Sequence, residues 1–233
     1  MKLAMRRYLP ILWLLGFVGC AGPRDGNHAD ALAARALSSV HPVAEPSAKL
    51  RELCAAVPSE SKDRVHLFVL NGADPLYLGN LNGLCARMRD LGFRSVDCAE
   101  MWQGAAVRDR IVELRRREPE ARVALVGFSI ATKSARSIAN ELKEQNVKID
   151  LLVYLGGDTI GNVPASRPDN VGQVLNINGH GYMPRGGDLF FNGTDIDGAE
   201  NQRLDARHIL LPSRPETVEL LGRHLVALAQ RPE

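Results

Sequence analysis

Five consecutive residues at 127–131, Gly-Phe-Ser-Ile-Ala, place one serine where a reactive hydroxyl could be held. They follow a short apolar run at 123–126 and precede a segment, 131–143, with the pattern of a helix. A serine on a tight turn between a buried strand and a helix exposes its hydroxyl, and small neighbours let the strained backbone pack closely. The first amides of the helix would also point at negative charge forming near the serine. The turn therefore predicts a nucleophile at Ser129.

A serine hydroxyl is a weak nucleophile at neutral pH, so it needs a general base and an acid that orients the base. Three histidines follow Ser129 along the chain. His180 lies in a glycine-rich loop, His208 precedes an apolar run near the C-terminus, and His224 lies within an expected helix. His224 is expected to be a surface residue, so from the residues alone the base stays open between His208 and His180.

The elements that must position these residues alternate along the chain from residue 64 onward. Apolar runs predict strands at 65–70, 93–98, 123–128, 148–155 and 174–177, and helical spacing predicts helices at 78–91, 107–117, 131–143 and 216–229. This alternation predicts an α/β fold, a three-layer α/β/α sandwich around a mostly parallel sheet. In such sheets functional sites collect at the carboxyl ends of strands, where Ser129, Asp158 and His180 are all expected.

Five segments, taken in order, resemble the small lidless bacterial lipases and esterases of the α/β-hydrolase superfamily. They are residues 65–73, 123–131, 152–158, 197–201 and 208–220, so the resemblance spans residues 64 to about 228. It implies an α/β-hydrolase-like fold and hydrolysis of a small-molecule carboxylic ester through an acyl-serine intermediate, without a cofactor or metal. The chain departs from the family pattern at Asn71, where histidine is usual, and at Ala131, where glycine is usual.

The resemblance also implies a role for individual residues. Ser129 corresponds to the nucleophile and His208 to the general base. Asp188 corresponds best to the acid, because the apolar run 189–191 follows it; Asp158 is the competing acid, and Asp195 and Asp197 come next. The oxyanion hole would be formed by the backbone N–H groups of Ile130 and Ala73.

The N-terminus resembles a bacterial lipoprotein signal peptide. Basic residues precede an apolar core at 9–19, which is too short to span a bilayer as a helix and ends at Cys20. We expect a signal peptide at 1–19, lipid on Cys20, and a protein anchored to the cell envelope that faces the periplasm or the cell exterior; secretion without lipid is the alternative. Residues 20–48 are rich in small and polar residues and predict a flexible tether before a domain at 49–233.

Composition excludes some classes of partner. The chain has 233 residues and a formal net charge of +2, and its arginine cluster at 115–117 is surrounded by glutamates. This pattern favours a solvated helix face over a nucleic-acid site, and we expect a monomer of one folded domain. A disulfide among Cys54, Cys85 and Cys98 is expected in an exported protein; the Cys54–Cys98 pair is favoured, although the pairing stays open.

A second function class is a non-catalytic envelope protein that has kept the same fold. The departures at Asn71 and Ala131 favour it, whereas the order of serine, aspartate and histidine along the chain opposes it.

Overall fold

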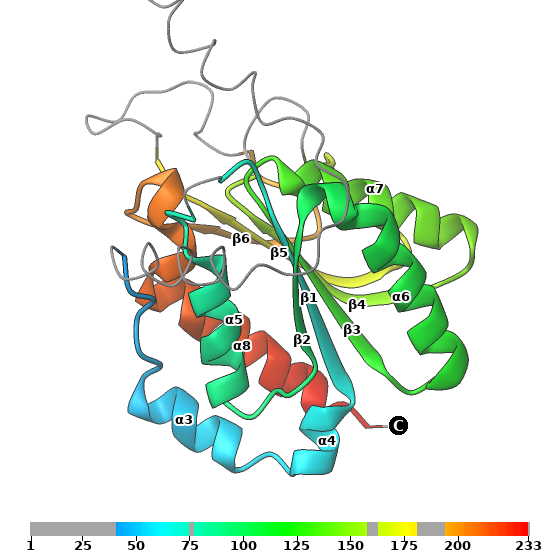
Figure 1. The fold of residues 1–233 in the computed structure, drawn as a ribbon, viewed down its shortest axis with the longest axis horizontal. Helices are drawn as coiled ribbons and strands as arrows, with labels where there is room; N and C mark the ends of the chain where they lie inside the picture. Colours follow the sequence, from blue (N-terminus) through cyan, green and yellow to red (C-terminus); the bar gives the residue numbers. More distant parts are fainter. Residues whose placement is uncertain (1–40, 75–76, 158–162, 181–193, 233) are drawn as a thin grey trace, which may run out of the picture. The chain divides into compact units, whose positions relative to one another are not determined.

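The computed structural model describes residues 41–74, 77–157, 163–180 and 194–232 (Figure 1). Cys20, Asp158 and Asp188 lie outside these ranges, so the expected lipidation site and both leading candidates for the acid are not described. Labels of helices and strands below follow Figure 1. Among the described residues, no helix combines the length and the apolar character needed to cross a bilayer.

A six-stranded sheet forms the middle layer, and all of its strands are parallel. The strand order is β2-β1-β3-β4-β5-β6, which places the strand before Ser129 near the centre of the sheet. The strands are β1 (Val65–Asn71), β2 (Val96–Glu100), β3 (Arg122–Phe128), β4 (Ile149–Leu155), β5 (Val171–Asn178) and β6 (Glu200–Arg203). The predicted α/β class and parallel sheet are confirmed.

Helices cover both faces of this sheet (Figure 1). One face carries α6 (Gly104–Arg117) and α7 (Ala131–Glu144), and the other carries α3 (Ala48–Ala55), α5 (Leu81–Asp90) and α8 (Pro215–Ala229). The short elements are α4 (Ser59–Asp63), η1 (Met101–Gln103) and η2 (His208–Ser213). Two hydrophobic cores, one on each side of the sheet, follow from this arrangement.

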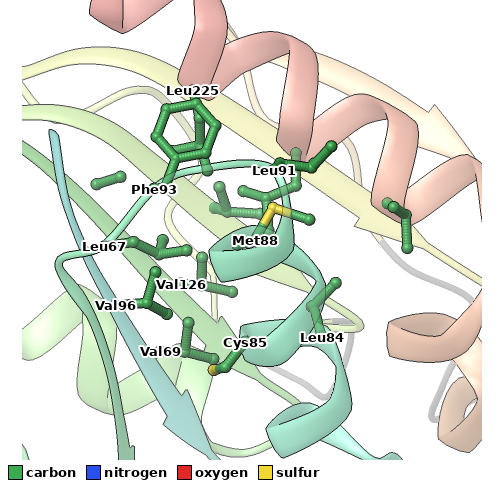
Figure 2. Packing of buried hydrophobic residues seen from close by; sticks show 14 of the residues in the cluster. Leu67, Val69, Leu84, Cys85, Met88, Leu91, Phe93, Val96, Val126 and Leu225 are labelled. Atoms are coloured by element: carbon green, nitrogen blue, oxygen red, sulfur yellow. The ribbon is translucent and has the colours of Figure 1, made fainter. Parts of the chain in front are cut away.

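The core beneath α5 shows how the sequence pattern becomes packing (Figure 2). Leu67 and Val69 of β1 belong to one core cluster with Leu84 and Met88 of α5, and all four side chains are buried. The two helical residues are four apart, so they lie on one face of α5, and the two strand residues are two apart, so they lie on one face of the sheet. Complete burial of one such side chain contributes about 2 kcal/mol.

The structure corrects two expectations about elements. The strand predicted at 93–98 begins later, at Val96, because Phe93 follows the left-handed turn at Gly92 and packs into the core, with its N–H donating to the Met88 carbonyl. The polar edge strand β6 was not expected, since its burial pattern lacks any buried position.

The disulfide joins Cys85 of α5 to Cys98 of β2, and the favoured Cys54–Cys98 pair was wrong. Helix α5 packs directly against β2, whereas α3, which carries Cys54, packs against α8. Cys54 is buried as a free thiol, and burial raises its pKa.

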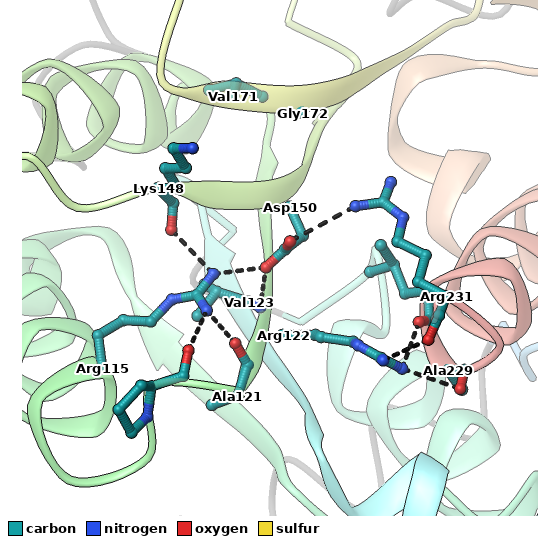
Figure 3. Close-up of polar contacts among 12 residues, drawn as sticks. Arg115, Ala121, Arg122, Val123, Lys148, Asp150, Val171, Gly172, Ala229 and Arg231 are labelled. Atoms are coloured by element: carbon teal, nitrogen blue, oxygen red, sulfur yellow. Dashed lines mark hydrogen bonds and ion pairs between the residues drawn. The ribbon is translucent and has the colours of Figure 1, made fainter. Parts of the chain in front are cut away.

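A polar network stabilises the end of the sheet at which β3 and β4 begin (Figure 3). The buried Arg122 guanidinium donates to the Leu228, Ala229 and Arg231 carbonyls at 2.8, 2.9 and 2.5 Å. Asp150 beside it accepts from Arg115 at 2.6 Å and from the Val123 N–H at 2.8 Å. These contacts hold the start of β3 in place, at the opposite end of that strand from Ser129.

The final part of the expected tether is attached to the domain. Val43 is buried in the core, the Ala44 N–H donates to the Ser213 carbonyl at 3.0 Å, and the Asn80 amide donates to the His41 carbonyl at 3.0 Å. Residues from His41 onward therefore pack against the α5 side of the fold.

Candidate active site

The turn between β3 and α7 holds Ser129 in a left-handed backbone conformation, with φ of +56°. A non-glycine residue in this region is strained, and such strain persists only where surrounding contacts fix it. Those contacts are present: the Ser129 N–H donates to the Leu155 carbonyl of β4 at 2.9 Å, and the Thr132 hydroxyl donates to the Ser129 carbonyl at 2.6 Å. The geometry is that of a sharp strand-to-helix elbow with a half-buried serine at its tip.

The elbow tolerates the departure at residue 131. Ala131 is fully buried in the core beneath α7, and it begins that helix directly after the turn. A methyl group therefore fits where the family pattern has glycine, and the position has no room for a large side chain.

The loop after β1 approaches the elbow closely at Gly72. A Cβ placed on Gly72 would lie 2.6 Å from the Phe128 carbonyl oxygen and 3.0 Å from Ser129 Cβ. Only glycine allows this approach of two backbones. The neighbouring residue, Ala73, is exposed, as is Ile130 on the other side of the serine. Among the described residues, neither the Ala73 N–H nor the Ile130 N–H donates to a backbone carbonyl. This is what two oxyanion donors require, because each N–H must be available to the substrate oxygen.

His208 lies at the base of the same site, at the start of η2. Its imidazole is buried and stacks on the Phe128 ring, with centroids 5.3 Å apart and planes inclined by 20°. Its Cε1 and Nδ1 atoms abut Gly156, where a Cβ would lie 2.8 Å from each. The structure thus brings His208 to the residues that flank the elbow.

Burial sets the protonation state of this histidine. Desolvation lowers the pKa of His208 to about 4, because the apolar surroundings disfavour the imidazolium. His208 is therefore neutral at physiological pH, which is the form that accepts a proton.

The other histidines that follow Ser129 lie in different surroundings. His180 is exposed and its Nε2 lies 3.3 Å from Asp205, and His224 on α8 lies 3.2 Å from Glu200. Both contacts are ion pairs near the surface when the imidazole is protonated, and neither places the ring against Phe128.

Asp195 and Asp197, the two remaining candidates for the acid, are exposed beside β6. Asp195 lies 4.0 Å from Arg203, and the Asp197 backbone pairs with residues 165 and 167. Among the described residues, no group of three His, Cys, Asp or Glu side chains is arranged to hold a metal ion.

Sequence reasoning missed a polar cluster at the ends of β1 and β2. Asn71 is buried and its amide donates to Glu100 at 3.3 Å, and the Tyr77 side chain also hydrogen-bonds to Glu100. Asp74 is buried too and accepts from the Leu78 and Gly79 N–H groups at 2.9 and 2.7 Å. The one available signal was Asn71 itself, a polar residue closing an apolar strand.

Comparison with known proteins gives no family assignment. No family model and no curated protein matches the chain. Among solved structures, human thioesterase 2 is 12% identical, with 72% of this chain and 96% of that chain covered and a TM-score of 0.47. The RedJ thioesterase from the prodiginine pathway of Streptomyces coelicolor is 15% identical, with 91% and 99% covered and a TM-score of 0.44. At TM-scores below 0.5, the geometry of the site remains the basis for a functional assignment.

Proposed function

We propose that this chain is a serine hydrolase that cleaves a carboxylic ester through an acyl-serine intermediate. The observation that carries the proposal is the strained Ser129 elbow, with Gly72 packed against it on one side and His208 buried against Phe128 below it. Backbone strain at non-glycine residues clusters at functional sites, where surrounding contacts hold it in place.

Each residue then has a defined role. Ser129 Oγ attacks the ester carbonyl while His208 accepts the hydroxyl proton, and His208 returns that proton to the departing alcohol. The Ile130 and Ala73 N–H groups receive the oxyanion, and one such donor is worth about 3–4 kcal/mol of transition-state stabilisation. Water then attacks the acyl-serine with His208 again as base, which releases the acid and restores Ser129.

The acid that orients His208 is proposed to be Asp188, with Asp158 as its rival. One contact supports the rival: His208 Nδ1 lies against Gly156, and Asp158 follows Gly156 by two residues in the sequence. Asp188→Asn and Asp158→Asn should be compared by kcat/KM on a short p-nitrophenyl ester. Replacement of the true acid should lower kcat/KM by several orders of magnitude, because an amide favours the wrong tautomer of the histidine. Small, equal losses from both would exclude a triad built on either aspartate.

A fluorophosphonate probe, which phosphonylates activated serines, tests the proposal directly. We expect the folded protein to be labelled, the label to map to Ser129, and Ser129→Ala to remove it. Ser137→Ala is the matched control, because that hydroxyl lies on the exposed face of α7 and bonds to Glu141. A folded protein that resists labelling would overturn the hydrolase assignment.

That outcome would support a non-catalytic binding protein with the same fold. The departures from the family pattern at Asn71 and Ala131 favour this second candidate. Labelling decides between the two candidates.

We further propose that Cys20 carries lipid and anchors the protein to the cell envelope. The support is the short apolar segment that ends at this cysteine. Metabolic labelling with palmitate should mark the wild-type chain and leave Cys20→Ser unmarked; release of unlabelled wild-type protein in soluble form would refute the anchor.

A further inference from the structure

A cavity of about 60 Å³ lies at the carboxyl ends of β1 and β2. Its polar lining comes from Asn71, Tyr77, Asn82, Glu100 and Gln103. The volume is enough for one small polar group or a few water molecules.

The cavity begins one residue away from the elbow. Asn71 lines it, and the next residue, Gly72, is the one whose Cβ would lie 3.0 Å from Ser129 Cβ. The cavity therefore adjoins the loop that packs against Ser129.

The lining of the cavity selects for hydrogen-bond donors. Glu100 is the charged side chain among the lining residues described, and it already accepts from Asn71 at 3.3 Å and from Tyr77. Because the carboxylate takes the amide nitrogen of Asn71, the amide oxygen is left over, and this buried Oδ1 has no hydrogen-bond partner among the described residues. A buried acceptor without a partner is costly, so a donor that reaches it is stabilised.

The charge of the surroundings favours a cation over a neutral donor. Burial raises the pKa of Glu100, and the negative charge of Asp74 nearby raises it further. A positive charge in the cavity would therefore stabilise these two carboxylates. No lysine or arginine belongs to the described lining to supply that charge.

We propose that this cavity is a subsite for a protonated primary amine carried by the substrate, a few atoms from the scissile ester carbonyl. Glu100 supplies the counter-charge and Asn71 Oδ1 an additional acceptor. This inference rests on the proposed esterase function and names its substrate class, an ester with a short amino-bearing arm. A hydroxyl group offers the same hydrogen bonds without the charge.

Three p-nitrophenyl esters separate these alternatives, because their acyl chains differ only at the terminal group: 3-aminopropanoate, 3-hydroxypropanoate and butanoate. We expect kcat/KM for the amino ester to exceed that for butanoate about tenfold or more, the effect of one charge-assisted hydrogen bond, with the hydroxy ester between them. Glu100→Gln should remove the preference for the amine. Glu52→Gln, an exposed carboxylate on α3, should keep it.

Several results would overturn the subsite. They are equal or better turnover of butanoate by the wild-type chain, a preference for the hydroxy ester, or an amine preference that survives Glu100→Gln. If Glu100→Gln loses fluorophosphonate labelling of Ser129 as well, the residue supports the elbow instead of binding an amine.

Failure of the esterase proposal is recognised separately, by wild-type protein that does not react with fluorophosphonate. The subsite is then tested by calorimetric titration with β-alanine methyl ester. Binding that Glu100→Gln weakens about tenfold would support the amine subsite in a binding protein, and equal affinity of the two proteins would reject it.

Discussion

At the scale of single residues, the site depends on two residues held in energetically unfavourable states. Ser129 has a backbone conformation that costs about 1–3 kcal/mol, and His208 is an ionisable group placed in an apolar environment. Both costs are met by the packing around them, through β4 for the serine and through Phe128 and Gly156 for the histidine.

The depressed pKa of His208 predicts how stability depends on pH. In the unfolded chain the imidazole takes up a proton near the ordinary histidine pKa of 6.5, whereas in the folded state its pKa is about 4. The unfolded state therefore binds more protons between these values, so the stabilisation is present above about pH 6.5 and is lost as pH falls towards 4. The loss from this one group should be about 3 kcal/mol.

Urea unfolding at pH 7 and pH 4 measures this effect. His208→Asn should reduce the difference in unfolding free energy between the two pH values by about that amount, because it removes the titrating group. His180→Asn, at an exposed position, should leave the difference unchanged. An unaltered pH difference in His208→Asn would show that the histidine is not desolvated as described.

At the scale of elements, the parts that sequence reasoning predicted best are those with continuous apolar runs. Strand β3 and helix α7 were placed within a residue of their observed ends, because a fully buried strand and an amphipathic helix each carry a clear pattern. The start of strand β2 was predicted too early, because Phe93 has the apolar character of a strand residue but packs into the core before the strand begins. Strand β6 was missed because an exposed edge strand has no apolar pattern.

The candidate site follows the same rule. The turn at Ser129 and the position of His208 could be predicted, since each directly follows or precedes a patterned element. The acid stays a prediction, because Asp158 and Asp188 lie outside the described residues. The Asn71–Glu100 cluster and the Cys85–Cys98 bond could not be predicted, since both join segments whose contact depends on how α5 and β2 pack.

The close approach of the β1 loop to the elbow gives a prediction at this scale. Gly72→Ala would place a Cβ 2.6 Å from the Phe128 carbonyl oxygen, so one of the two backbones must move. We expect the rate of fluorophosphonate labelling to fall at least tenfold, because a shift of this order misaligns an oxyanion donor. Gly104→Ala is the control, since its Cβ would meet nothing nearer than Ile138 at 3.7 Å. Equal labelling rates in both variants would contradict a role for this loop.

At the scale of the whole molecule, parts of the chain that are distant in sequence meet at the amino end of β3, the end remote from Ser129 (Figure 3). Arg122 at the start of β3 donates to three carbonyls in and beyond the last turn of α8. A buried guanidinium is stable only while such acceptors surround it.

Loss of this cation should destabilise the entire fold. Arg122→Met leaves the three carbonyls without their donor, and we expect the free energy of unfolding to fall by about 3 kcal/mol. Arg223→Met is the control, because the exposed Arg223 forms an ion pair with Glu219 that is worth less than about 1 kcal/mol. Chemical denaturation of both variants, followed by circular dichroism, checks the difference; equal midpoints would refute the structural role of Arg122.

The same contact has a consequence for biosynthesis. The carbonyls that surround Arg122 come 106 to 109 residues later in the chain, so β3 leaves the ribosome long before its partners are made. Until residue 231 has been synthesised, closing the core would bury a positive charge without acceptors. The nascent chain should therefore stay open until its last helix is released, and premature termination within that helix should yield a product that proteases remove.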